Sequence, residues 1–306
     1  MTAKAQQVSI KQVHDDAAAA CAAAGNKVPV PEAIPRSPIN ADVMGWFQDK
    51  GSSWVVRILA IIGAIGVWQL ASSFQWSFFL SFENVPTPVV VFDALLAQLN
   101  NVEFYKHIMV SLQRILLSYL LAVVIGVMIG VLMGMYKIAE DIFLPYIEIL
   151  RPIPAVAWIP MAILVMPTEE SSIIFITFLG ALFPIILNTV HGVEQTPVNL
   201  IRAAKSFGAN GRNILWHVVL PGALPSILAG LAIGMGVAWF SLLAGEIISG
   251  QYGIGYFTWS AYTLVEYPNI IIGMLIIGLL GTGSTALVRL MAKPMLRWQG
   301  EKGGNR

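Results

Sequence analysis

Six long apolar runs constrain this chain more than any other feature of its sequence. About 20 consecutive apolar residues are enough for one helix to cross the hydrocarbon core of a bilayer. With 11% charged residues, the chain also falls well below the roughly 25% that is usual in soluble domains. We therefore predict an all-α polytopic membrane protein with about six transmembrane helices, at Val55–Phe74, His107–Met135, Ile142–Met166, Ile173–His191, Ala223–Ile248 and Ile270–Leu290.

The third run cannot form one straight helix, because prolines interrupt it. Proline removes a backbone donor and bends a helix, and non-helical backbone at membrane depth has to be buried in protein or line a cavity. We expect the break near Arg151, which lies among Pro145, Pro152, Pro154 and Pro160.

The segment before the first run is polar and rich in alanine and proline. We expect residues 1–45 to be a disordered cytoplasmic tail, since Asp15 and Asp16 precede an alanine run too weakly apolar for a signal peptide. Residues 46–85 would hold an interfacial segment and the first transmembrane helix, and residues 86–300 the core transmembrane domain. The expected interfacial anchors are Trp46, Phe47 and Trp54.

Lysine and arginine set the expected orientation, because they are enriched in the cytoplasmic segments of membrane proteins. An inside N-terminus puts most basic residues on one side, while the opposite loops hold mainly acids such as Glu83, Glu169 and Glu266. Both termini are thus predicted to be cytoplasmic, as is the polar stretch between the fourth and fifth runs. The inside set is Lys50, Arg57, Lys137, Arg202, Lys205, Arg212, Lys293, Arg297, Lys302 and Arg306.

Little in the sequence points to catalysis or to a bound cofactor. Cys21 is the single cysteine, and the four histidines are scattered without the spacing of a metal site. The chain also lacks a G-x-x-x-x-G-K-[ST] phosphate loop and shows no nucleophile motif. We expect no cofactor or metal on this chain, and its net charge of +1 gives no indication of nucleic-acid binding.

The polar stretch at residues 196–221 is predicted to form a helical hairpin. Thr196 would cap a first helix that begins at Pro197, and Gly208 would end that helix. Asn210 would then cap a second short helix that ends before Pro221.

Ala203 and Ala204 leave a bare surface on the first helix of the hairpin, where a partner could approach closely. Arg202, Lys205 and Arg212 frame that surface. On chemistry alone, an amphipathic loop lying on anionic lipid explains these residues as well as a protein contact does.

The spacing within this hairpin resembles the EAA loop of ABC importer permeases. The matching residues are Ala203, Ala204, Gly208, Leu220 and Pro221, with Val218 where that family usually has isoleucine and Arg202 in place of its glutamate. Further stretches, "LRPIPAVAWIP", "LPGALPSILAGLAIGMGVAW" and "GEIISGQYGIGY", are similar to the nitrate/sulfonate/taurine/bicarbonate branch. The resemblance extends over about residues 85–297.

The resemblance implies the type I importer (MetI-like) transmembrane fold and a non-catalytic permease of the bacterial inner membrane. Two copies would form the path, two ABC ATPase subunits would bind ATP and Mg, and a periplasmic or lipid-anchored solute-binding protein would deliver the solute. Alternating access would carry a small anion of the nitrate, sulfonate/taurine or bicarbonate class into the cytoplasm. The residues implied to couple to the ATPases are Pro197, Asn199, Arg202, Ala203, Ala204, Lys205, Phe207, Gly208, Leu220 and Pro221.

A secondary transporter driven by an ion gradient is the alternative class. Broken helices and charges within spans would suit it equally well. The chain shows no evident inverted repeat, however, and such a carrier has no need for an EAA-like loop. A membrane-embedded enzyme is a more distant alternative.

Charges within the predicted spans are rare, and three of them are candidates for function. A charge at the bilayer centre costs about 2.5–3.5 kcal/mol on insertion scales, so it usually faces the bundle interior or a cavity. For Arg114 and Glu246 we favour a structural role over contact with the substrate: either an ion pair that holds helices together or snorkelling of the side chains to the outer interface. Arg151 would either pair with carbonyls freed by the neighbouring prolines or attract an anion. Trp239 and Ser241 complete the candidate translocation path, because the family's path borders that span.

A ridge of glycines in the second run indicates close helix packing. Gly126, Gly130 and Gly134 repeat at every fourth residue, and small residues at this spacing let two helix backbones approach. Packing is therefore the expected role of this ridge.

Overall fold

The computed structural model describes residues 39–76 and 82–296, and these residues form helices joined by loops, with no strand among them. The chain divides into two units, Met1–Ile65 and Gly66–Arg306. The first unit holds most of the described part of helix α2 (Ile39–Ser73). The apolar part of that helix, Trp54–Ser73, coincides with the first predicted transmembrane helix.

Helix α2 begins earlier than the sequence analysis predicts. A tail is expected up to residue 45, but the chain is helical from Ile39 onward. Between Pro38 and Pro86 there is no proline, so nothing stops a helix that propagates from the apolar run back to Ile39. Residues 1–38 of the predicted tail lie outside the described residues, as do the side chains of Trp46 and Phe47.

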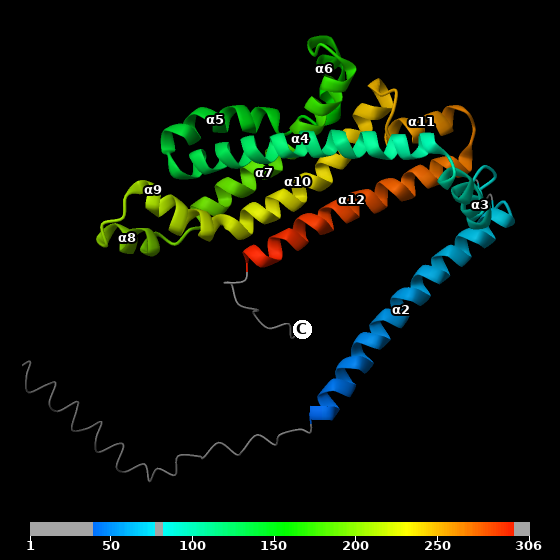
Figure 1. Ribbon diagram of the computed structural model, residues 1–306, viewed down its shortest axis with the longest axis horizontal. Helices are drawn as coiled ribbons and strands as arrows, with labels where there is room; N and C mark the ends of the chain where they lie inside the picture. The colour runs from blue at the N-terminus through cyan, green and yellow to red at the C-terminus, as the bar shows by residue number, and fades with distance from the viewer. Residues whose placement is uncertain (1–38, 77–81, 297–306) are drawn as a thin grey trace, which may run out of the picture. The chain divides into compact units, whose positions relative to one another are not determined.

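The second unit contains the other helices, which Figure 1 colours from cyan to red. In chain order they are α3 (Pro88–Leu99), α4 (Val102–Met135), α5 (Lys137–Leu150), the 3-10 helix η1 (Ala155–Trp158), α6 (Ile159–Val165), α7 (Glu169–Glu194), α8 (Val198–Ser206), α9 (Gly211–Ile214), the π-helical turn η2 (Leu215–Val219), α10 (Leu220–Ser249), α11 (Ile254–Thr263) and α12 (Tyr267–Met295).

The six predicted spans are all found among the described residues. Five helices are long and apolar enough to cross a membrane, and a sixth span results if the bent pair of α5 and η1–α6 counts as one. The two halves of this pair, Lys137–Leu150 and Ala155–Val165, meet at an angle of 88°. Pro152 and Pro154 lie at the bend, which confirms that the third run is not a straight helix.

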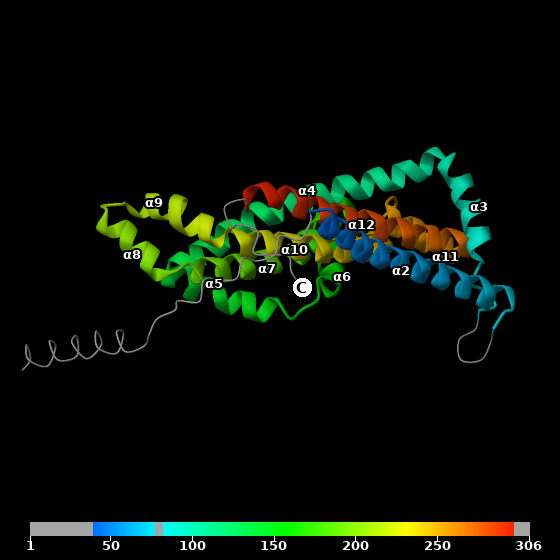
Figure 2. The same ribbon diagram turned by 90° about the horizontal axis from the view of Figure 1, so that it is seen from below.

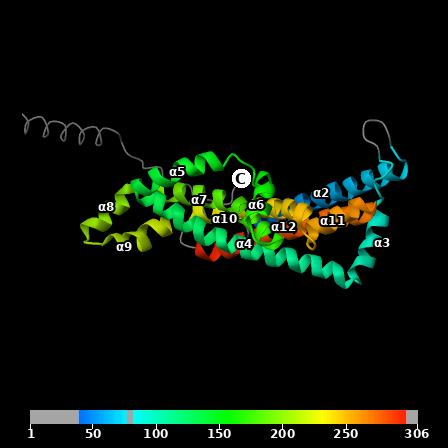
Figure 3. The same cartoon turned by 90° about the horizontal axis from the view of Figure 1, so that it is seen from above.

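Helices α7 and α10 run together through the middle of the second unit, with α4 beside them (Figures 2 and 3). The hairpin of α8 and α9 lies at one end of these long helices, and α3 lies at the other. The largest core cluster joins the three helices, with Ile115 and Ala122 from α4, Ile185 from α7, and Ala238 and Leu242 from α10.

Glycine allows these three helices to approach closely, as the sequence predicts. A Cβ placed on Gly130 of α4 would lie 2.6 Å from the Cβ of Thr189 in α7, and one on Gly126 would lie 2.9 Å from Ile185. On the other side of α7, a Cβ on Gly230 of α10 would lie 2.6 Å from Asn188. Lipid offers no hydrophobic force between helices, so this close van der Waals packing stabilises the bundle.

Two shorter helices, α3 and α11, are additions to the six predicted spans. Thr87 caps α3 through its side chain, which accepts a hydrogen bond from the Val90 amide, and Pro88 supplies the first helical position. Helix α11 packs against α4, where the rings of Phe257 and Phe104 meet edge to face with centroids 5.4 Å apart. Both helices lie near the same end of α4.

Replacing Gly130 with valine should destabilise the bundle by about 1–3 kcal/mol, because the new side chain overpacks the α4–α7 contact. Gly278→Val is the matched control, since a Cβ at Gly278 of α12 meets nothing within 4 Å among the described atoms. We expect a lower midpoint of thermal unfolding in detergent for Gly130→Val and little change for the control. Equal midpoints for the two variants would contradict the packing role.

Candidate functional site

The hairpin between α7 and α10 is the first candidate site. Helix α8 begins after Pro197, which occupies the N-cap position without a side-chain hydrogen bond. The prediction that Thr196 caps α8 is wrong. Its side chain is buried, and Oγ1 donates a hydrogen bond to the Gly192 carbonyl at 3.4 Å. Thr196 therefore ties the hairpin to the end of α7 instead of capping α8.

The end of α8 forms as predicted. Gly208 has φ +80°, a left-handed conformation that glycine adopts without strain. Its amide donates to the Lys205 carbonyl at 2.9 Å, and the amide of Ala209 donates to the Ala204 carbonyl at 3.0 Å. This pair of bonds is a Schellman motif, which pairs two of the last free carbonyls of the helix.

The second half of the hairpin differs from the prediction. Asn210 precedes α9 but makes no capping bond through its side chain, and the helix does not end before Pro221. It passes through the π-turn η2 directly into α10, and the Leu220 amide donates to the Leu215 carbonyl. The wider turn accommodates Pro221, which cannot donate a hydrogen bond, so Gly211–Ile248 forms one long span.

The hairpin has a packed side and an uncovered side. Ile201 and Ala204 pack toward Val193 and Val219 in a core cluster that joins α7 to α10. The bare surface predicted for both alanines is thus half right, because Ala203 is exposed but Ala204 is partly buried. Leu220 and Pro221 are also partly buried.

The uncovered side is basic and carries one aromatic residue at its tip. Phe207 is 90% exposed. Residues 195–216 contain no aspartate or glutamate. The other exposed residues of the predicted coupling set are Pro197, Asn199, Arg202, Ala203, Lys205 and Gly208, and Arg212 is exposed beside them.

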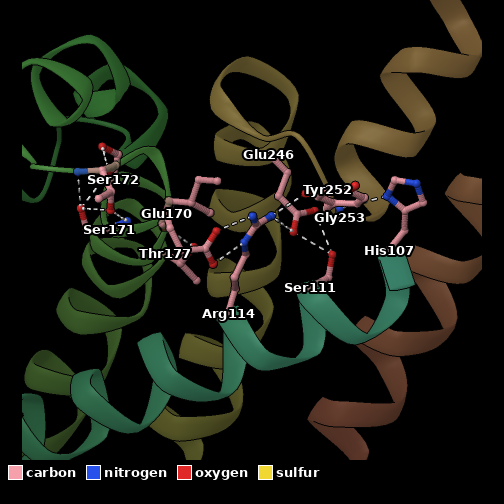
Figure 4. Close-up of polar contacts among 12 residues, drawn as sticks. His107, Ser111, Arg114, Glu170, Ser171, Ser172, Thr177, Glu246, Tyr252 and Gly253 are labelled. Carbon is pink, nitrogen blue, oxygen red and sulfur yellow. Dashed lines mark hydrogen bonds and ion pairs between the residues drawn. The ribbon is translucent and has the colours of Figure 1, made fainter. Parts of the chain in front are cut away.

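A buried ion-pair network at the other end of the long helices is the second candidate site (Figure 4). Arg114 of α4 donates through Nη1 to Glu246 Oε1 of α10 at 3.0 Å. Its Nε and Nη2 donate to the two carboxylate oxygens of Glu170 in α7, at 2.8 and 2.5 Å. The side chain of Glu246 is fully buried, that of Arg114 is 6% exposed and that of Glu170 is 52% exposed. One guanidinium therefore joins three transmembrane helices.

Glu246 also fixes the loop that follows its own helix. The Ser111 hydroxyl and the Gly255 amide donate to its carboxylate at 2.7 and 2.9 Å. Gly253 has φ +122°, and a Cβ there would overlap the Glu246 carboxylate. Two glycines of the stretch "GEIISGQYGIGY", Gly253 and Gly255, therefore let the backbone wrap closely around the buried Glu246 side chain.

The structure brings Arg114 and Glu246 together as an ion pair, which is one of the two structural roles that the sequence analysis proposes for them. Sequence reasoning missed the other members of the network. His107 and Ser111 precede Arg114 on one face of α4, and His107 Nδ1 accepts a hydrogen bond from the Gly253 amide at 3.1 Å. Their spacing at i, i+4 and i+7 is the signal that could have identified them.

A cavity of about 290 Å³ at the break of the third span is the third candidate site. Arg151 and Ser241, two of the predicted path residues, both line it. Trp239 lies elsewhere: it is buried, and its Nε1 donates to Ser284 of α12 at 2.7 Å. Arg114 and Glu246 do not line this cavity either.

Among the described residues, no group of three or more His, Cys, Asp or Glu side chains could hold a metal ion.

Arg114→Gln should destabilise the protein far more than Glu170→Gln. The first change leaves the buried Glu246 carboxylate without its counter-charge, which costs about 3–5 kcal/mol in comparable buried pairs. The second removes a half-exposed partner, for which about 1 kcal/mol or less is usual. Thermal unfolding in detergent measures the difference, with Arg289→Gln on the exposed face of α12 as the control. Equal shifts for both network variants would contradict the structural role of the buried pair.

The family described as "Binding-protein-dependent transport system inner membrane component" matches residues 122–296. The aliphatic sulfonates transport permease SsuC of Escherichia coli is 37% identical over 248 residues, which cover 80% of this chain and 93% of that protein.

Two further relatives have related names. The taurine transport system permease protein TauC of Escherichia coli is 32% identical, over 84% of this chain and 93% of its own length. The nitrate import permease protein NrtB of Synechocystis is 32% identical, over 73% of this chain and 82% of its own length. The chain therefore belongs to the binding-protein-dependent transport system inner membrane components, the permease subunits of ABC importers, and within them to the nitrate, sulfonate and taurine branch.

Proposed function

We propose that this permease moves a small anion into the cytoplasm by alternating access, driven by separate ATPase subunits that bind the hairpin at residues 196–221. The observation that carries the proposal is the uncovered side of that hairpin. Phe207 projects from its tip with 90% of its surface exposed. Its exposure contributes nothing to the fold of this chain, whereas its burial in a partner would contribute about 1.5–3 kcal/mol.

The surroundings of Phe207 indicate a protein partner more than a lipid surface. The Schellman motif at Gly208 fixes the turn, so Phe207 is presented from a rigid helix end and not from a loose loop. Arg202, Lys205 and Arg212 lie near it on the exposed surface and call for an acidic partner surface. Arg202 replaces the glutamate of related permeases, and we therefore expect an acidic group in the ATPase groove at that point.

The hairpin is mechanically connected to the centre of the membrane domain. Thr196 bonds to the end of α7, and Ile201 and Ala204 pack against Val193 and Val219 at the junction with α10. Helix α10 then continues without a break to Ser241 and Glu246. Movement of the hairpin would therefore shift α7 and α10 together, which is the motion that alternating access requires.

The proposal also covers the orientation of the chain and its partners. The hairpin and both termini would face the cytoplasm, and the ATPases would bind ATP and Mg there. The Arg114 network, at the opposite end of α10, would face the solute-binding protein. A second copy of this chain would complete the path, along the face of α10 that exposes Ile233, Val237 and Phe240. The permease itself would catalyse no reaction.

The substrate class rests on the relatives. Their names give aliphatic sulfonates, taurine and nitrate as the transported solutes. We propose a solute of this class, in which we include bicarbonate, because all of these carry an oxoanion group of modest size.

Purification from the native membrane tests the assembly. Mass spectrometry of the tagged protein in mild detergent should identify a co-purifying polypeptide that contains a G-x-x-x-x-G-K-[ST] phosphate loop. The alternative, a secondary transporter, predicts that the chain alone transports solute in liposomes under an ion gradient. Transport without any ATPase would overturn the proposal.

Phe207→Ala should reduce recovery of the ATPase subunit by about tenfold or more, because the lost aromatic contact is worth at least about 1.4 kcal/mol. Phe74→Ala is the matched control, since Phe74 is 79% exposed but lies far from the hairpin in sequence. The measurement is the molar ratio of ATPase to permease after purification. A ratio that is unchanged by Phe207→Ala, or lowered equally by both variants, would contradict docking at the hairpin tip.

A further inference from the structure

We infer that the cavity at the break of the third span binds an organic oxoanion that carries no second charge, with Arg151 as its counter-charge and Trp158 as a hydrogen-bond donor. The inference rests on the proposed function and deepens it. It names a binding site for the solute, and it predicts that this site prefers simple alkyl sulfonates to amino-sulfonates.

Three segments build the cavity. Arg151, Pro154 and Trp158 come from the bend between α5 and α6. Gly180 and Phe183 belong to α7, and Val237, Phe240 and Ser241 belong to α10. Its volume is about 290 Å³, which is at the lower end of the range for small-molecule sites. The bend that the prolines impose is therefore what opens a space between helices that otherwise pack closely.

Arg151 is a cation without a partner in this structure. Its side chain is exposed to the cavity and forms no hydrogen bond or ion pair with any described residue. Arg114 is the opposite case, because it bonds to Glu170, Glu246 and the Tyr252 carbonyl. A guanidinium is shaped for two parallel hydrogen bonds to an oxoanion, and only Arg151 has donors left for that purpose.

Trp158 supplies a second, independent observation. Its indole Nε1 is buried and has no acceptor among the described residues. A buried donor left unpaired costs about 1–3 kcal/mol, so such groups normally have a partner. Trp158 lines the same cavity as Arg151, and an oxoanion held there would bring an acceptor.

Two of the cavities in this domain contain an arginine, and the charges around that arginine favour one of them for an anion. None of the described residues that line the Arg151 cavity is acidic. The other cavity, of about 330 Å³, is lined by Arg114, Glu169 and Glu170, and its one guanidinium is already neutralised by carboxylates. An anion would be repelled there and attracted to Arg151.

The apolar walls of the Arg151 cavity determine what else the ligand can carry. Leu179, Leu187 and Val237 suit an aliphatic body. An ammonium group would find no carboxylate there, and leaving water costs a charged group several kcal/mol. Cation–π contact with the rings of Phe183 and Phe240 would offset only about 0.5–2 kcal/mol of this desolvation cost. The cavity should therefore hold a sulfonate with a plain alkyl chain in preference to one with an amino group.

Equilibrium binding to the permease–ATPase complex in nanodiscs, without the solute-binding protein, tests the inference directly. The probes are radiolabelled propane-1-sulfonate and taurine, which differ in a terminal methyl against an ammonium group. We expect propane-1-sulfonate to bind at least about tenfold more tightly. Equal affinity, or tighter binding of taurine, would overturn the exclusion of a second charge.

Variants test the site. Arg151→Gln should weaken binding of propane-1-sulfonate by at least about tenfold, as expected for the loss of a charge-assisted hydrogen bond. Arg151→Lys, which keeps the charge but not the two parallel donors, should restore only part of the binding. Trp158→Phe, which keeps an aromatic side chain but removes the indole N–H, should weaken binding several-fold. Arg289→Gln removes a cation of the same domain that lines neither cavity and should leave binding unchanged.

The outcomes separate this inference from the proposed function. Recovery of the ATPase with each variant reports on assembly alone. If the ATPase co-purifies but Arg151→Gln binds propane-1-sulfonate as well as the unchanged protein does, the site is wrong and the importer proposal stands. If no ATPase co-purifies with the unchanged protein, the importer proposal fails first. Absence of any propane-1-sulfonate binding to an intact complex would also overturn the site.

Discussion

Close approach of helix backbones is the constraint on which the rest of this structure depends. In lipid, helices gain nothing from hiding apolar surface, so their association needs short van der Waals contacts and internal polar bonds. Glycines on α4 and α10 provide the contacts on both sides of α7. Arg114 provides the polar bonds, because one side chain joins α4 to both α7 and α10. The glycine contacts and the Arg114 ion pairs lie at different depths along the same three helices.

A rigid bundle leaves the broken third span as the place where space can open. Its two halves bend by 88°, and neither α5 nor α6 contains a glycine that could form a contact of the kind seen on α4. Backbone groups freed by the prolines must be satisfied inside the protein or at a water-filled surface. The cavity beside Arg151 lies at this break, and Pro154 is among the residues that line it. A feature that weakens the helix thus also creates a cavity in which a cation without a described partner meets apolar walls.

The sequence predicts the parts of this structure that depend on local pattern. Span positions follow from apolar length, the bend from Pro152 and Pro154, and the end of α8 from Gly208. It does not predict which distant groups meet: Arg114 is 56 residues from Glu170 and 132 from Glu246. Thr196 shows the same limit, because tertiary packing against α7 removes the side chain from its capping position. The glycines of "GEIISGQYGIGY" match a family pattern in the sequence. Only the structure shows that Gly253 and Gly255 are needed because the backbone lies against the buried Glu246 carboxylate.

Arg114 and Arg151 differ in the one property that decides their roles, namely whether the donors of the guanidinium are already used. Arg114 bonds to two carboxylates and a carbonyl, so its charge is neutralised and its position fixed. A solute would have to displace an existing partner to reach it. Arg151 faces a cavity with its donors unused, and binding there costs no internal bond. Since both lie beside α7 or α10, the helices that the hairpin connects, movement of these helices would rearrange the Arg151 cavity while the Arg114 network holds their far ends together.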